Sequence, residues 1–299
     1  MKILILGSEG FIGSHCIDYF LKKGHSVEGV DLFEQSSKQY RYHKVSRLSP
    51  ELDELFLTGA FDAVINAAGS GNVPYSMSHP VLDFEANSLD TIRVLDFLRK
   101  HQPACKYLYL SSAAVYGNPI RLPVLEEDAT HPLSPYGWHK LIGEKICLEY
   151  SSVYGLRTAI VRPFSVYGPR LKKQMFWDIY QKFKQSKDPI ELLGTGDESR
   201  DYVFIRDVVY GLDCVLQNGA MNGEAYNLAS GIETKIKDAV ELFAETLGST
   251  RQYKFNGLVR PGDPLNWKAD NSKIKQLGFQ SVTTFSAGLK ELTEWIIKT

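Results

Sequence analysis

The sequence lacks an excess of charge of either sign. Its 34 Lys and Arg residues stand against 35 Asp and Glu residues, which gives a net charge of −1, and no long block of like charges occurs. A nucleic-acid partner or an anionic membrane surface requires a basic patch, so this balance argues against both. Long hydrophobic runs are also missing, because the apolar run at residues 3–7 is too short for a signal peptide or a membrane span. We therefore expect a cytoplasmic protein.

Cysteine is scarce, and its spacing carries no structural pattern. Cys16, Cys105, Cys147 and Cys214 lie far apart without a CxxC pair, unlike a disulfide framework or a zinc site. We expect them to be small, buried apolar residues. The seven histidines include no HxxxH pair, so the sequence predicts no metal site, and His139 is interpreted as a surface residue.

Hydrophobic residues make up 43% of the 299 residues, which is enough for one large core or two smaller ones. In the first half of the chain, short apolar segments alternate with segments of helical periodicity, and this alternation predicts βαβ units. The predicted fold class is therefore α/β, with a doubly wound, Rossmann-type parallel sheet. We expect strands at residues 2–7, 25–31, 62–69, 106–112 and 157–163, and helices at residues 11–23, 51–58, 81–99 and 135–150.

The alternation ends after Pro163, where glycine and proline turns separate shorter elements. This change predicts a Rossmann domain over residues 1–164 and a smaller C-terminal lobe over residues 165–299. We expect the chain to return to the first domain near residues 202–230. The sequence has no internal repeat and no low-complexity segment that would suggest another division.

Three glycines, Gly7, Gly10 and Gly13, lie between the first predicted strand and the first predicted helix. Bare backbone at a helix N-terminus can approach a pyrophosphate, although the same glycines could simply form a tight turn. Asp31 ends the second predicted strand, 18 residues after Gly13. A carboxylate there can accept both hydroxyls of an adenosine ribose and repel a 2′-phosphate. The two features together predict a dinucleotide site that prefers NAD to NADP.

Tyr136 and Lys140 are four residues apart on a predicted helix, so both side chains lie on one face. A nearby ammonium favours the tyrosinate and makes Tyr136 a usable base. The spacing alone is weak, because chance gives about one Tyr-x-x-x-Lys in a chain of this composition, and this chain has four. Only this pair opens a helix after a buried strand that ends in serines. Ser112 could relay a proton from a substrate hydroxyl to Tyr136, or could simply cap the strand end.

In their order along the chain, these motifs resemble those of the extended short-chain dehydrogenases/reductases, specifically the nucleotide-sugar epimerase and dehydratase group that includes UDP-glucose 4-epimerases. The resemblance runs nearly end to end. Further matching segments are Asn66-Ala67-Ala68-Gly69, Ser76, Pro80, Asn87, Val115-Tyr116-Gly117, Arg162-Pro163-Phe164, Val166-Tyr167-Gly168-Pro169, Arg200-Asp201-Tyr202 and Arg260-Pro261-Gly262-Asp263.

The resemblance implies two ligands, NAD in the Rossmann domain and a nucleotide-diphosphate sugar in the C-terminal lobe. The implied catalytic residues are Ser112, Tyr136 and Lys140. The implied cofactor-binding residues are Gly7, Gly10, Phe11, Ile12, Gly13, Asp31, Ala67, Ala68, Gly69, Asn87, Tyr136, Lys140 and Pro163. The implied substrate-binding residues are Ser112, Ser165, Arg200, Arg260 and Asp263, with the two arginines on the diphosphate, where a guanidinium pairs bidentately with phosphate oxygens.

The family reaction begins when Tyr136 takes the proton of the sugar C4 hydroxyl and hydride leaves C4. In the family's 4,6-dehydratases the two residues after the active-site Ser or Thr are Asp and Glu, whereas this chain has Ala113 and Ala114. Alanine cannot move a proton, so dehydration is disfavoured. The leading hypothesis is a 4-epimerase of carbohydrate metabolism, with a role in cell-surface polysaccharide biosynthesis. The alternatives are a C4 dehydrogenase or reductase and, less favoured, a non-catalytic NAD-binding regulator.

The chain departs from the family pattern at Ser165, where the family usually has Asn, and in residues 42–48, which lack an acidic residue that often touches adenine. The resemblance also implies a homodimer with a four-helix seam. The residues that could form this seam, although ordinary core packing explains them equally well, are Leu89, Ile92, Leu95, Leu141, Ile142 and Ile146.

Overall fold

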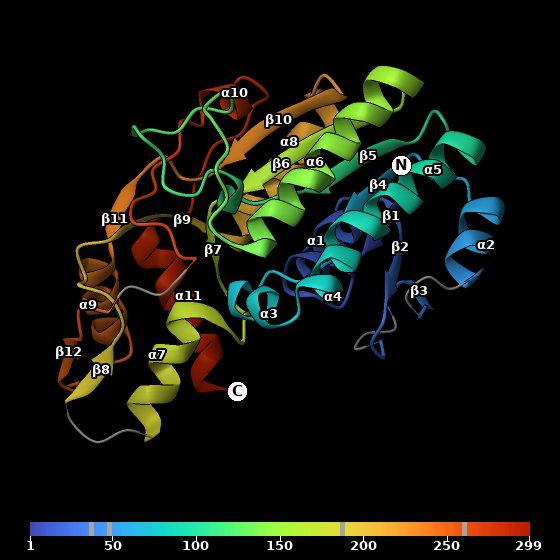
Figure 1. The fold of residues 1–299 in the computed structure, drawn as a ribbon. Coiled ribbons are helices and arrows are strands. Elements are labelled where there is room, and N and C mark those ends of the chain that lie inside the picture. The colour runs from blue at the N-terminus through green and yellow to red at the C-terminus, as the bar shows by residue number, and fades with distance from the viewer. Residues whose placement is uncertain (36–38, 47–49, 186–188, 259–261) are drawn as a thin grey trace.

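The computed structural model describes residues 1–35, 39–46, 50–185, 189–258 and 262–299. A seven-stranded parallel sheet forms its centre (Figure 1), which confirms the predicted doubly wound α/β fold. The strand order is β10-β6-β5-β4-β1-β2-β3. The strands are β1 (Lys2–Leu6), β2 (Ser26–Asp31), β3 (Arg41–Lys44), β4 (Ala63–Asn66), β5 (Lys106–Leu110), β6 (Arg157–Pro163) and β10 (Asn222–Leu228).

Strand β1 shows why these strands read as unbroken apolar runs. Ile3 and Ile5 pack into a core cluster on one face of the sheet, and Leu4 and Leu6 pack into a second cluster on the other face. All four side chains are buried, because helices cover both faces. The four cysteines are buried and free of disulfides, as expected.

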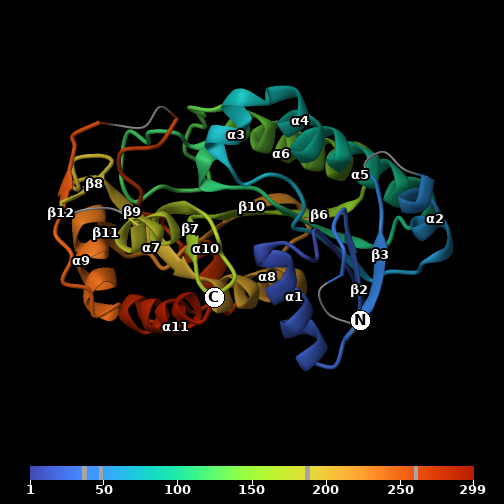
Figure 2. The ribbon, with the colours of Figure 1, turned by 90° about the horizontal axis from the view of Figure 1, so that it is seen from below.

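Helices α1 (Phe11–Lys22) and α8 (Ile205–Asn218) cover one face of the sheet, and α5 (Asp90–His101) and α6 (Pro135–Tyr154) cover the other (Figure 2). Helix α2 (Pro50–Thr58) packs against α5. Within the described residues, no helix combines the length and the apolar character needed to cross a membrane.

The helix expected at residues 81–99 has a different form. A short helix α3 (Val73–Ser78) leads into α4 (Pro80–Phe84), then a π-helical turn η1 (Glu85–Leu89), and only then α5. A π turn inserts one extra residue per turn and so rotates the side chains that follow it. In η1 the middle residues, among them Asn87, are buried.

The C-terminal lobe lies at one end of the sheet (Figure 1). Its core is aromatic, with Tyr167, Phe176, Tyr202, Phe243 and Phe285 in ring contact. Helix α8 and strand β10 come after this lobe's first elements in the sequence. Strand β10 is nevertheless part of the central sheet, and α8 packs against that sheet. The lobe's elements are β7 (Ser165–Tyr167), α7 (Gln174–Gln185), β8 (Ile190–Leu192), β9 (Ser199–Phe204), β11 (Glu233–Lys235), α9 (Ile236–Thr246), β12 (Tyr253–Phe255) and α11 (Phe285–Ile297). The short helix α10 (Ser272–Lys275) packs against β10 and α8 instead.

Candidate active site

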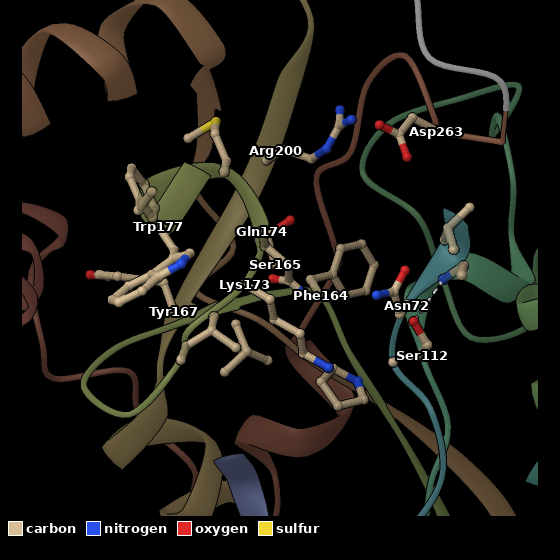
Figure 3. A pocket seen from close by; sticks show the side chains of 18 of the residues that line it. Asn72, Ser112, Phe164, Ser165, Tyr167, Lys173, Gln174, Trp177, Arg200 and Asp263 are labelled. Atoms are coloured by element: carbon tan, nitrogen blue, oxygen red, sulfur yellow. Dashed lines mark hydrogen bonds between the residues drawn. The ribbon is translucent and has the colours of Figure 1, made fainter. Parts of the chain in front are cut away.

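A cleft of about 950 Å³ runs from the carboxyl ends of the central strands to the C-terminal lobe (Figure 3). Ligands of open α/β sheets bind at this edge. Most of the residues singled out from the sequence line this one cleft. They are Gly10, Phe11, Ile12, Ala67, Ala68, Gly69, Ser112, Tyr136, Lys140, Pro163, Ser165, Arg200 and Asp263.

Four other predicted residues lie behind the cleft wall, and Arg260 lies outside the described residues. Two of the four are glycines of the first turn. Gly7 has a φ of 77°, and a Cβ there would lie 2.8 Å from the Ala67 oxygen. A Cβ on Gly13 would lie 2.0 Å from the Gly7 oxygen. Both glycines therefore let the turn and helix α1 sit close to β1 and β4.

Asp31 closes β2 beside this glycine turn. Its Oδ2 accepts a hydrogen bond from the Glu9 amide at 2.9 Å, and its Oδ1 accepts one from the Leu32 amide at 2.7 Å. These two bonds fix the carboxylate at the strand end while leaving lone pairs for further donors.

Asn87 lies directly behind Gly69. Its Nδ2 donates to the Asp83 carbonyl at 3.0 Å, whereas its Oδ1 is buried without a hydrogen-bond partner among the described residues. A Cβ on Gly69 would lie 2.4 Å from that oxygen. The glycine turn, Asp31 and this orphaned amide oxygen together form a cradle of the kind a dinucleotide fits, with backbone amides for a pyrophosphate and acceptors for ribose hydroxyls.

Tyr136 owes its position to the start of α6. Ser134 caps the helix by accepting a hydrogen bond from the Gly137 amide at 3.2 Å, and Pro135 occupies the first helical position. Burial raises the pKa of Tyr136 to about 12, while a hydrogen bond from Ser112 acts in the opposite direction. Ser112 also accepts a hydrogen bond from the Ala114 amide at 3.1 Å, which caps the short 3-10 helix Ala113–Val115 that follows β5.

Lys140 lies one helical turn beyond Tyr136 and is buried. Its Nζ donates to the Leu110 carbonyl, at the end of β5, at 2.8 Å. Burial lowers the pKa of Lys140 to about 8, although the Asp83 carboxylate partly offsets this shift. Ser112, Tyr136 and Lys140 thus meet at the end of one strand and the start of one helix, as a proton-transfer set requires.

The interpretation of His139 as a surface residue is wrong. Its side chain is only 13% exposed, and its Nδ1 lies 2.6 Å from the Oδ2 of Asp83, which is fully buried. Ser88 of η1 also donates to the His139 carbonyl at 2.9 Å. These contacts tie helix α6 to α4 and η1 next to Lys140. A single sequence cannot reveal this, because the two partners are 56 residues apart.

A buried ion pair joins strand β6 to helix α6. Arg162 at the end of β6 donates to both carboxylate oxygens of Glu144 in α6, at 2.8 and 2.7 Å, and to Tyr116 at 2.7 Å. Such bidentate pairs have well-defined geometry. The pair fixes β6 relative to the helix that carries Tyr136 and Lys140.

Arg200 and Asp263 lie at the lobe end of the cleft (Figure 3). The Arg200 guanidinium lies 5.6 Å from the ring centre of Trp267, and one of its nitrogens donates to the carbonyls of Ser199 and Leu265 at 2.8 and 3.1 Å. Its other N–H groups have no bonding partner among the described residues. Arg200 is therefore held in place with donors left for an anion.

Several residues that line the cleft carry no signal in the sequence. Gly168 and Pro169 end a segment that resembles the family, and the side chains that follow them show no periodicity that would indicate which of them line a cleft. The missed lining residues include Asn72, Val73 and Pro74 at the start of α3, Trp267, and Lys173, Gln174 and Trp177 at the start of α7.

Comparisons with known proteins agree with this geometry. The sequence model of the NAD dependent epimerase/dehydratase family matches residues 3–229. The uncharacterized UDP-glucose epimerase YtcB of Bacillus subtilis is 32% identical over 97% of this chain and 96% of its own length. The GDP-6-deoxy-D-mannose reductase of Pseudomonas aeruginosa is 30% identical over 82% of this chain and 79% of its own. The crystal structure of UDP-glucuronic acid 4-epimerase from Bacillus cereus, in complex with UDP-glucuronic acid and NAD, superposes with a TM-score of 0.91. It has 27% identity and covers 100% of this chain and 99% of that one. The chain therefore belongs to the NAD dependent epimerase/dehydratase family.

Proposed function

We propose that this protein is an NAD-dependent 4-epimerase of UDP-sugars. The observation that carries the proposal is the meeting of Ser112, Tyr136 and Lys140 in a cleft that also holds the glycine turn at one end and Arg200 at the other. The names of the Bacillus subtilis and Bacillus cereus proteins support the same reaction.

NAD would occupy the Rossmann end of the cleft, where it supplies a reversible hydride acceptor for the sugar C4. The turn of Gly7, Gly10 and Gly13 would hold its pyrophosphate with backbone amides. Asp31 would accept the adenosine ribose hydroxyls and exclude a 2′-phosphate. We assign cofactor binding to residues 1–164 with the returning segment 202–230, and substrate binding mainly to the rest of residues 165–299. The remaining assigned contacts are Phe11, Ile12, Ala67, Ala68, Gly69, Asn87 and Pro163.

Tyr136 would take the proton from the sugar C4 hydroxyl, through or beside the hydroxyl of Ser112. Lys140 would supply the positive charge that makes the tyrosinate accessible. When the 4-keto sugar turns its other face to the cofactor and accepts the hydride again, Tyr136 would return the proton. A single residue thus serves as base and then as acid.

Arg200 would pair with the diphosphate of the substrate, Asp263 would contact another part of the substrate, and Ser165 of β7 would contact the sugar. Arg260 is assigned to the diphosphate by its motif alone. Ala114 lines the cleft and Ala113 is buried beside it, so neither position offers a group for eliminating water. This supports epimerisation over 4,6-dehydration.

One relative favours a second candidate function. The Pseudomonas aeruginosa protein is named a reductase, and a C4 reductase would use the same Ser112, Tyr136 and Lys140. The two functions differ in the fate of the hydride, since an epimerase returns it and a reductase or dehydrogenase exchanges it with free cofactor.

The test is proton NMR, with parallel absorbance at 340 nm, on purified protein given NAD and a panel of UDP-, dTDP-, GDP- and CDP-sugars. We expect a C4-inverted UDP-sugar without stoichiometric NADH. Stoichiometric NADH with a 4-keto product would contradict the epimerase and establish a C4 dehydrogenase instead.

A further inference from the structure

Four cationic side chains line the described part of the cleft: Lys140, Lys173, Lys182 and Arg200. Three of them donate to main-chain carbonyls at 2.7–2.8 Å. Lys173 alone has neither a hydrogen bond nor an ion pair to any described residue. Burial within the cleft lowers its pKa, and no acidic group offsets the shift.

The backbone around Lys173 is held in an unusual conformation. Lys173 immediately precedes helix α7, and the residue after it, Gln174, has a φ of 68°. Arg170, three residues earlier, has a φ of 74°. Residues other than glycine rarely adopt the left-handed backbone conformation, so the surrounding structure must enforce it. Backbone strain of this kind is concentrated at ligand and active sites. Lys173 therefore lies between two residues with left-handed backbone, in a segment of the kind found at ligand sites.

The Lys173 ammonium lies in the same part of the cleft as Tyr136. A Cβ built on Gly71 would lie 3.8 Å from the Lys173 Nζ and 4.0 Å from the Tyr136 hydroxyl, so the two polar atoms flank the same point of the cleft wall. In Figure 3 the Lys173 side chain extends from the α7 wall toward the side on which Ser112 lies. Arg200 lies elsewhere, at the lobe end of the cleft.

We propose that the sugar of the substrate is a hexuronic acid, whose C5 carboxylate pairs with Lys173. The inference rests on the proposed function, because it assumes that the C4 hydroxyl lies on Tyr136. C5 is bonded to C4, so a carboxylate on C5 would lie near Tyr136, in the part of the cleft where the Lys173 Nζ also lies. A neutral hexose would remove water from this ammonium and offer no anion in return, which is unfavourable, whereas a carboxylate restores a charge-assisted hydrogen bond.

The test compares UDP-glucuronic acid with UDP-glucose. The two differ only at C6, the carbon attached to C5, which is a carboxylate in the first and a hydroxymethyl group in the second. Binding to the NAD-loaded protein is measured by calorimetry, and turnover is measured in parallel. We expect the wild type to bind UDP-glucuronic acid more tightly, and Lys173→Met to reduce the ratio of the two affinities roughly 10- to 100-fold. Lys173→Arg should keep most of the preference.

Lys172→Met is the matched control. Lys172 is the neighbouring lysine, but its Nζ lies 6.0 Å from the ring centre of Trp295 and does not line the cleft. This variant should keep the wild-type affinity ratio. The dissociation constant of NAD is measured for every variant, because Lys173 could instead contact the cofactor.

The proposal is overturned if the wild type does not prefer the hexuronate, or if Lys173→Met weakens both sugars equally. It is also overturned if that variant mainly weakens NAD. In each case a wild type that still epimerises UDP-glucose leaves the proposed function intact. A protein that neither binds nor epimerises any UDP-sugar would contradict the proposed function itself.

Discussion

Tyr136 is protonated at neutral pH in the structure described above, since burial raises its pKa to about 12. It can act as a base only if positive charge lowers that value. Lys140 is the cation on the same helix face, and the nicotinamide ring of bound NAD would add a second charge. In the proposed mechanism, the rate therefore depends on the positive charges around the Tyr136 phenol.

Lys140→Met should slow turnover by roughly 10²- to 10⁴-fold at neutral pH. Loss of the ammonium raises the pKa of Tyr136, so the tyrosinate fraction at a given pH falls. The activity, which rises as Tyr136 loses its proton, should therefore rise at a higher pH than in the wild type. The measurement is kcat as a function of pH, with the exposed Lys145→Met on the same helix as control. An unshifted midpoint would exclude this role for Lys140.

Tyr136→Phe should abolish epimerisation while leaving NAD bound, because it removes the proton acceptor and keeps the ring. Turnover and the NAD dissociation constant are measured on the same preparation. Tyr180→Phe is the control, since Tyr180 also begins a Tyr-x-x-x-Lys pattern but does not line the cleft. Full activity of the Tyr136 variant would refute the mechanism.

The turn between β1 and α1 can pack closely only because its glycines have no side chains. A Cβ on Gly13 would lie 2.0 Å from the Gly7 oxygen, a distance that requires backbone movement. Gly13→Ala should lower the free energy of unfolding by about 1–3 kcal/mol and weaken NAD binding. Denaturant titration and NAD calorimetry test this, and wild-type values in both would show that the close packing of this turn is not needed.

The elements differ in how far they could be predicted. Strand β1 and its neighbours were predictable because burial on both faces leaves apolar runs. The π-helical turn η1 was not predictable, because a π turn has no residue composition that distinguishes it from an α-helix. In this turn Asn87 and its neighbours are buried. The place of Lys173 in the cleft was not predictable either. It follows a turn and precedes a left-handed Gln174, and no residue pattern predicts either conformation.

For the whole molecule, the proposed homodimer would use the outer surface of α4 and α6. Helices α4 and α6 are joined by the Asp83–His139 contact, and both carry exposed apolar side chains. Two residues expected at a seam, Leu95 and Leu141, are instead buried in the chain's own core. The exposed apolar side chains on α4 and on the first half of α6 are Val81, Leu82, Phe84, Trp138 and Ile142, and Leu148, Val153 and Tyr154 are exposed farther along α6.

A charge placed in that surface should separate the subunits. We expect the wild type to sediment as a dimer and Ile142→Glu as a monomer, because a buried glutamate without a partner opposes association. Val282→Glu, at a side chain that is 74% exposed outside this surface, should remain dimeric. A monomeric wild type would contradict the proposed dimer.

In the proposed reaction, hydride leaves C4 and returns to the other face of the same sugar. The most direct measurement uses the active UDP-sugar deuterated at C4, with the product examined by NMR and mass spectrometry. We predict that the C4-inverted product retains its deuterium at C4 and that none appears in free NADH or in solvent. Deuterium lost to the cofactor pool or to water would contradict it.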